Sequence, residues 1–186
     1  MPDSSPTDAR MLTWKGQVKG RDMSRGLLYV EAYLPADLEA LAQFEALAAT
    51  AHKGDYVKAA KAAPELAAKA LTPIDSHGEG MLQDDVIALA HLVIKRGGKM
   101  DVMHSELTAT KPTPSPNLSL VQSFVNTPEI GSPNYWPGAW VCVVEVKRDT
   151  PEWADVVSGK LNAVSFMAVV TKVPVALQLQ PPAPAS

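Results

Sequence analysis

Two side chains in this sequence are of types suited to nucleophilic catalysis. Ser165 is the first hydroxyl-bearing residue of an apolar stretch, LNAVSFMAVV (161–170), and His104 ends a shorter stretch, KMDVMH (99–104). A serine becomes a good nucleophile when a neighbouring base takes its proton, and imidazole, with a pKa of about 6.5, suits that role. Their spacing does not establish that they meet. Ser165 is therefore either a nucleophile or a core serine bonded to nearby backbone.

The residues before Ser165 predict a short helix that leads into its strand. Thr150 can cap the helix through its hydroxyl, and Pro151 fits the first turn. Gly159 suits the left-handed position that ends a helix. Residues 161–170 are apolar and rich in β-branched side chains, which is typical of a central strand. The inward face of the helix is expected to consist of Trp153, Val156 and Val157.

The remaining pattern indicates an α+β fold with a mainly antiparallel β-barrel or sheet and flanking helices, because strands and helices do not alternate regularly. Residues 1–10 are expected to be disordered, 11–176 to form one domain, and 177–186 to be a Pro/Ala-rich tail. An alanine-rich helical insertion is expected at 35–71. The other expected helix covers 83–96, and the expected strands cover 12–18, 27–34, 99–104, 118–125, 139–146 and 161–170.

Composition argues against several classes of function. The net charge is −3 and there is no basic block, so nucleic acid is not an expected partner. No apolar run reaches the roughly 20 residues that a membrane helix needs. The single cysteine, Cys142, cannot form an internal disulfide, which fits a reducing compartment. It is expected to be a small buried hydrophobe rather than a catalytic thiol.

No cofactor or metal is expected. The acidic stretch around 75–85 could hold a cation, but no second His or Cys completes a zinc site, so a solvated loop and helix start is the favoured interpretation. There is no Walker loop, no GxGxxG motif and no GxSxG elbow. The candidate cation ligands in this stretch are Asp75, His77, Glu79, Asp84 and Asp85.

From about Ile74 to Val170 the chain resembles the phage prohead maturation serine proteases, relatives of the herpesvirus assemblins. The resembling segments are IDSHGEGMLQDDVIALAHLVI, MDVMHSE, LVQSFVNTPE and PGAWVCVVEVKRDTPEWADVVSGKLNAVSF. In that family a catalytic His lies on a strand, and the nucleophilic Ser follows a helix and a glycine by six residues. Gly159 and Ser165 keep that spacing.

The resemblance implies that Ser165 is the nucleophile and His104 the general base. Assemblins take a third triad member from after the serine, but neither acid nor His follows Ser165 here. An orienting carboxylate would then come from Glu145 or Glu106, with Glu31 and Asp101 as further candidates; otherwise the pair acts as a dyad. The family often has glycine where Ala163 stands and directly after the serine, so the oxyanion-hole donors are left open.

The expected function is that of a serine endopeptidase of phage capsid maturation. It would cleave scaffolding and major capsid proteins, and itself, inside the procapsid in the host cytoplasm, without a cofactor and as a homodimer or bound to scaffold. The alternative is a catalytically inactive capsid-assembly or scaffold-like module of the same fold. A third interpretation is an α+β binding domain unrelated to phage.

Overall fold

A computed structural model describes residues 9–74, 80–95, 97–98 and 115–171. The chain divides into two compact units. The described part of the first, here called the sheet unit, consists of residues 9–34, 84–95, 97–98 and 115–171, and that of the second, the helical unit, of residues 35–74 and 80–83.

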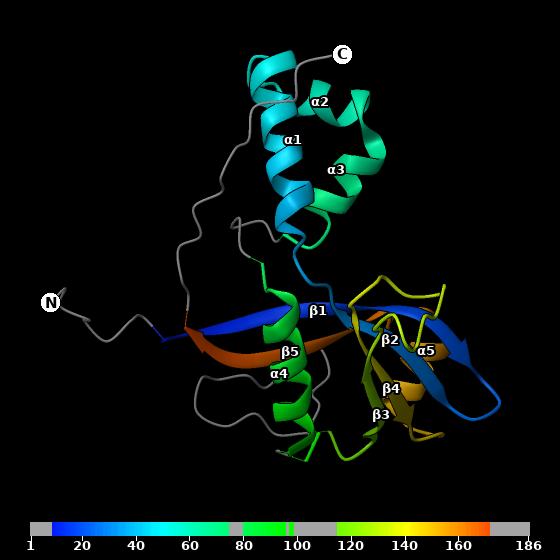
Figure 1. The fold of residues 1–186 in the computed structure, drawn as a ribbon. Helices are drawn as coiled ribbons and strands as arrows, with labels where there is room; N and C mark the ends of the chain where they lie inside the picture. The colour runs from blue at the N-terminus through cyan, green and yellow to red at the C-terminus, as the bar shows by residue number, and fades with distance from the viewer. Residues whose placement is uncertain (1–8, 75–79, 96, 99–114, 172–186) are drawn as a thin grey trace, which may run out of the picture. The chain divides into compact units, whose positions relative to one another are not determined.

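The sheet unit is built on five strands in the order β3-β4-β2-β1-β5, each antiparallel to its neighbours (Figure 1). The α+β class and the antiparallel sheet are therefore confirmed. Within the described residues the sheet is open, with β3 and β5 at its two ends, and does not close into a barrel. The strands are β1 (Ala9–Asp22), β2 (Leu27–Tyr33), β3 (Leu118–Val125), β4 (Trp140–Val146) and β5 (Ala163–Thr171).

The central strands explain how the sheet excludes water. In β2, Leu28 and Val30 are fully buried on one face. Every residue of β4 except Glu145 is buried, as expected for an apolar strand between two neighbours. Gly16 of β1 lies where a Cβ would come within 2.8 Å of a Val30 methyl carbon, so a larger residue would force β1 and β2 apart.

Strand β1 is longer than its sequence predicts. It begins at Ala9, so Ala9 and Arg10 are strand residues rather than part of a disordered terminus, and it continues to Asp22. Its first half pairs with β5 and its second half with β2. The β5 residues that bond its start are more than 140 positions away in the chain, and local pattern carries no such information.

Two helices belong largely to the sheet unit. Helix α4 (Gln83–Lys95) is followed by Gly97 and Gly98, whose N–H groups donate to the carbonyls of Ile94 and Val93, and a Cβ on Gly98 would lie 2.9 Å from a Leu120 side-chain carbon of β3. Helix α5 (Pro151–Val157) is capped by Thr150, whose Oγ1 accepts from Trp153 N at 3.2 Å. Val156 is buried, but the expected inward position of Val157 is wrong: its side chain is 59% exposed, because no other segment of the described chain packs over that side of the helix.

The helical unit confirms the alanine-rich insertion and consists of α1 (Leu38–Ala51), α2 (Tyr56–Ala62) and α3 (Pro64–Leu71). Asp37 and Asp55 cap α1 and α2 with their carboxylates. Phe44 is the one large side chain in a core otherwise made of small ones, namely Ala40, Ala48, Ala59, Ala67 and Ala70. Among the described residues, no helix is long and apolar enough to cross a membrane.

Candidate functional site

Ser165 is the third residue of β5, and its backbone is level with Lys15 of β1. Helix α5 and Gly159, which has a φ of +75°, come immediately before this strand, so the helix–glycine–strand order expected from the sequence is present. Blue β1 and orange β5 run side by side in Figure 1. His104, Glu106 and Asp101 lie outside the described residues.

Of the two candidate carboxylates in the described part of the chain, Glu31 lies nearer to Ser165 in the sheet. It is level with Gln17 of β1, which is level with Ala163 of β5, two residues before Ser165. Two strand spacings and two residue rises give a Cα–Cα separation of roughly 12 Å.

The carboxylate of Glu31 is buried, and each of its oxygens has a partner. Its Oε1 accepts the backbone N–H of Trp136 at 2.6 Å, and its Oε2 pairs with Lys19 Nζ at 3.0 Å. The residue is only 6% exposed. A buried charge of this kind persists where it is paired and hydrogen-bonded, so Glu31 is fixed in place by β1 and by the loop before β4.

That loop is held by a second buried polar side chain. Asn126 is 4% exposed, and its amide nitrogen donates to the carbonyls of Ser132, Tyr135 and Trp136, while its Oδ1 accepts from Ser132 N. Burial, and then the nearby Tyr29 and Glu31, raise the pKa of Tyr135 above its ordinary value. Asn126 and Glu31 together order the segment that carries Tyr135 and Trp136.

Glu145, in contrast, is not brought to Ser165. It is level with Leu27 of β2 and, through Leu27, with Asp22 of β1, whereas Ser165 is level with Lys15. Asp22 and Lys15 are seven residues apart on one strand, which corresponds to roughly 20 Å. Glu145 is also exposed. The expectation that it orients the base beside Ser165 therefore needs correction, since it belongs to the opposite end of the sheet.

Glu145 instead lines a pocket of about 690 Å³. The pocket lies between the β1–β2 turn, the start of β3 and the end of β4. Three of its lining side chains are cationic: Arg25, Lys147 and Arg148. Sequence reasoning missed it because its cations come from two segments more than 100 residues apart. The adjacent Lys147 and Arg148 were the only local signal.

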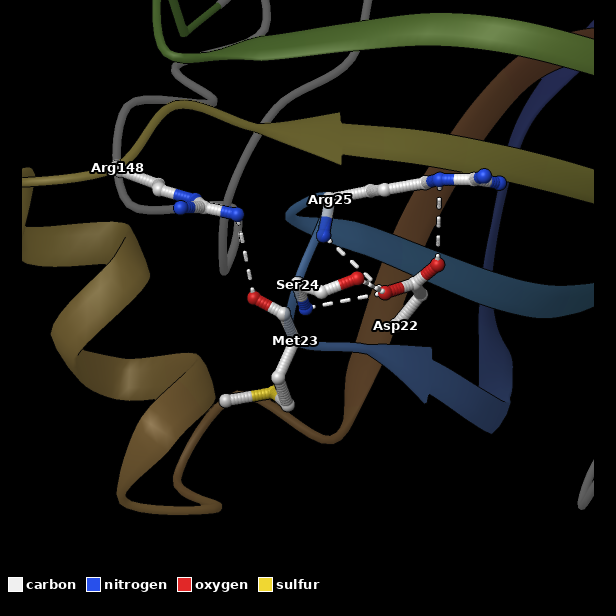
Figure 2. A network of polar contacts seen from close by, with 5 residues as sticks. All are labelled: Asp22, Met23, Ser24, Arg25 and Arg148. Atoms are coloured by element: carbon white, nitrogen blue, oxygen red, sulfur yellow. Dashed lines mark hydrogen bonds and ion pairs between the residues drawn. The ribbon is translucent and has the colours of Figure 1, made fainter.

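Figure 2 shows how the turn beside this pocket is held. The Asp22 carboxylate accepts from the backbone and hydroxyl of Ser24 and from the backbone of Arg25. The Ser24 hydroxyl and then these backbone bonds hold the pKa of Asp22 below its usual range, despite an opposing effect of desolvation. Arg148 donates to the carbonyl of Met23 at 3.5 Å.

The other candidate sites are accounted for as follows. Cys142 is completely buried in β4, and burial raises the pKa of its thiol far above the ordinary value, so it is an inert core residue as expected. Asp75, His77 and Glu79 lie outside the described residues. Among the residues that are described, no three His, Cys, Asp or Glu side chains cluster as metal ligands would.

The structure thus defines an α+β protein whose open antiparallel sheet carries Ser165 near one end and a cationic pocket near the other. Comparison of the chain with protein-family models, with curated proteins and with solved structures gives no significant match.

Proposed function

We propose that this protein is a serine endopeptidase of the kind that matures phage proheads. The observation that supports the proposal is the order α5–Gly159–β5: Ser165 lies in a strand of the sheet six residues after Gly159, and the resemblance noted in the sequence has the same spacing. In the proposed reaction Ser165 Oγ attacks the scissile carbonyl while His104 takes its proton. His104 then returns that proton to the leaving amine, and water hydrolyses the acyl-enzyme.

Glu31 is the proposed orienting carboxylate. Three features support it over Glu145: its burial, its position two strands from Ser165, and the two fixed contacts that hold it. A carboxylate in a poorly solvated site can hold a neighbouring imidazole in one tautomer and stabilise its protonated form. Both oxygens of Glu31 retain lone pairs for such a bond beside their present partners.

The proposed substrates follow from the resemblance. They are segments of scaffolding and major capsid proteins, and of this chain itself, cleaved inside the procapsid in the host cytoplasm. A homodimer or association with scaffold would restrict activity to the assembled particle. The chemistry proposed for Ser165 and His104 uses no metal or cofactor.

The proposal is tested by mass spectrometry after treatment with a serine-directed fluorophosphonate. The wild-type chain should gain one adduct on Ser165, and the Ser165→Ala and His104→Ala variants should not. Glu31→Gln should slow labelling by about 10-fold or more, whereas Glu145→Gln should leave the rate unchanged. The reaction should be run with and without assembled scaffold protein.

The alternative function is a non-catalytic capsid-assembly module of the same fold. It predicts no adduct on Ser165 in either condition, with a chain that remains folded by circular dichroism. That result, with scaffold present, would overturn the protease proposal.

A further inference from the structure

The pocket near Glu145 has walls that are fixed before any ligand arrives. Val146 N donates to the carbonyl of Gly26 at 2.8 Å, and Lys147 N donates to the carbonyl of Asn117 at 2.9 Å. Gly26 has a φ of +73°, and a Cβ there would lie 2.9 Å from Val146 O, so only glycine allows this approach of the turn to β4. The three segments that line the pocket are therefore joined by their backbones.

Each side of the pocket is also held by a carboxylate that does not line it. Asp22 secures the turn as described above. On the other side, Glu152 of α5 accepts from the hydroxyl of Ser115 at 2.9 Å and from the amide of Asn117 at 3.0 Å. A ligand that binds here would not have to order either wall, which lowers the entropic cost of binding.

The charge of the lining favours an anionic ligand. Arg25, Lys147 and Arg148 outnumber Glu145 at this pocket, although the whole chain carries a net charge of −3. The contacts that these arginines make are weak. Arg25 Nε lies 3.8 Å from an Asp22 carboxylate oxygen with its side chain 75% exposed, and Arg148 bonds a carbonyl at 3.5 Å. Exposed pairs of this kind contribute about 0–1 kcal/mol, so a carboxylate ligand can compete for both guanidinium groups.

The size and the remaining lining favour a peptide over a small anion. A volume of about 690 Å³ is in the usual range for organic ligands and far exceeds an inorganic ion. Leu27 and Pro116 contribute apolar surface, and the exposed Ser119 contributes a hydroxyl. An acidic peptide offers carboxylates to the cations, aliphatic carbon to Leu27 and Pro116, and backbone amides to Ser119.

We propose that this pocket binds acidic peptide segments. The inference goes beyond the proposed protease function and does not depend on it, because roughly 20 Å of sheet separates Glu145 from the level of Ser165. Glu145 gives the site a distinctive property. Its carboxylate repels those of the ligand, so it limits affinity and favours peptides whose acidic groups avoid it.

The test is fluorescence anisotropy with a labelled peptide that alternates Glu with Ala, and with the same peptide in which Gln replaces Glu. The full chain is used both as wild type and as Ser165→Ala, so that binding is measured separately from any cleavage. The Glu peptide should bind both chains saturably and with equal affinity. It should bind about 10-fold or more tightly than the Gln peptide, and added salt should weaken the binding of the Glu peptide.

Three variants locate the site. The double change Lys147→Gln and Arg148→Gln should lower the affinity by about 10-fold, because two charge-assisted contacts are lost. The matched double change, Lys53→Gln and Lys61→Gln, removes the same charge from exposed positions outside the pocket. It should alter the affinity for the Glu peptide by less than about 2-fold. Glu145→Gln should raise the affinity about 3-fold, a gain that misfolding cannot produce.

Three results would overturn the proposal. The first is equal binding of the Glu and Gln peptides, or no saturable binding of either. The second is an equal loss of affinity for the Glu peptide in the two double variants, which would mean that the peptide is attracted to the overall charge of the chain rather than to the pocket. The third is complete displacement of the peptide by millimolar inorganic phosphate, which would make the pocket a small-anion site.

Discussion

At the scale of single residues, Glu31 is expected to be a principal polar contributor to the stability of the sheet unit. Glu31→Ala leaves the backbone N–H of Trp136 without its acceptor and should lower the free energy of unfolding by about 2 kcal/mol. Glu31→Gln keeps an acceptor but loses the ion pair with Lys19, and should cost about 1 kcal/mol. Urea unfolding followed by tryptophan fluorescence measures both, since all four tryptophans belong to the sheet unit.

The matched control is Glu145→Ala, which removes a carboxylate from the exposed position of a neighbouring strand and should change stability by less than about 0.5 kcal/mol. Equal losses at Glu31 and Glu145 would show that the Trp136 and Lys19 contacts add nothing. This outcome would also remove the main support for Glu31 as the residue that orients the catalytic base.

A comparison of Glu31 with Glu145 shows which properties of the site can be predicted from the sequence and which cannot. Alternation in β2 correctly places Glu31 opposite the face of Leu28 and Val30. It cannot show that Glu31 is buried, because the segment that bonds it comes from Trp136, about 100 residues later. Sequence alone favours Glu145 over Glu31 for the same reason: the strand order and register that separate Glu145 from Ser165 depend on long-range pairing.

At the scale of elements, Glu152 links the first turn of α5 to the segment that precedes β3. Burial opposes ionisation of Glu152, but its own backbone and then Asn117, Ser115 and Thr150 bond the carboxylate and hold its pKa below the usual range. A pKa that is lower in the folded state stabilises the fold above the unfolded-state value of about 4.3. This contribution is lost as pH falls through the folded-state pKa.

The stability difference between wild type and Glu152→Gln should therefore be constant near neutral pH and shrink below about pH 4. Urea midpoints measured by tryptophan fluorescence across this range give the difference directly. Asn117→Ala should reduce the difference and its pH dependence, because it removes the amide that bonds both carboxylate oxygens. A difference that grows on acidification would contradict the assigned direction of the pKa shift.

Local signals predict the elements well where the residues that determine them are adjacent in sequence. The Thr150 cap, the terminal Gly97 and Gly98 of α4 and the alanine-rich helices all follow from short-range rules. Short-range rules do not predict the full length of β1, the open form of the sheet or the exposure of Val157. Each depends on which distant strand or surface lies alongside, and that is decided by tertiary packing.

At the scale of the whole molecule, the helical unit has the features of an inserted module. It interrupts the sheet unit between β2 and α4 and has a core of its own around Phe44. The two ends of the insertion meet: Pro35 and Met81 form a parallel bridge, and Ala36 N donates to the carbonyl of Met81 at 2.8 Å. A short chain can therefore span the point where the module enters and leaves.

Replacing residues 37–80 with a short Gly/Ser linker should leave the sheet unit folded. The strands keep their own buried core, and shortening a loop whose ends already meet changes the free energy of loop closure by only about 2 kcal/mol. The shortened chain should keep the native tryptophan emission and a cooperative urea transition, while the helical circular dichroism signal falls.

In the full chain, Phe44→Ala should cause the helical signal to be lost at a lower urea concentration than the tryptophan signal, because it removes the one large side chain of the helical unit's buried core. Loss of the tryptophan transition in the shortened chain, or coincident transitions in Phe44→Ala, would mean that the sheet needs the helical unit in order to fold.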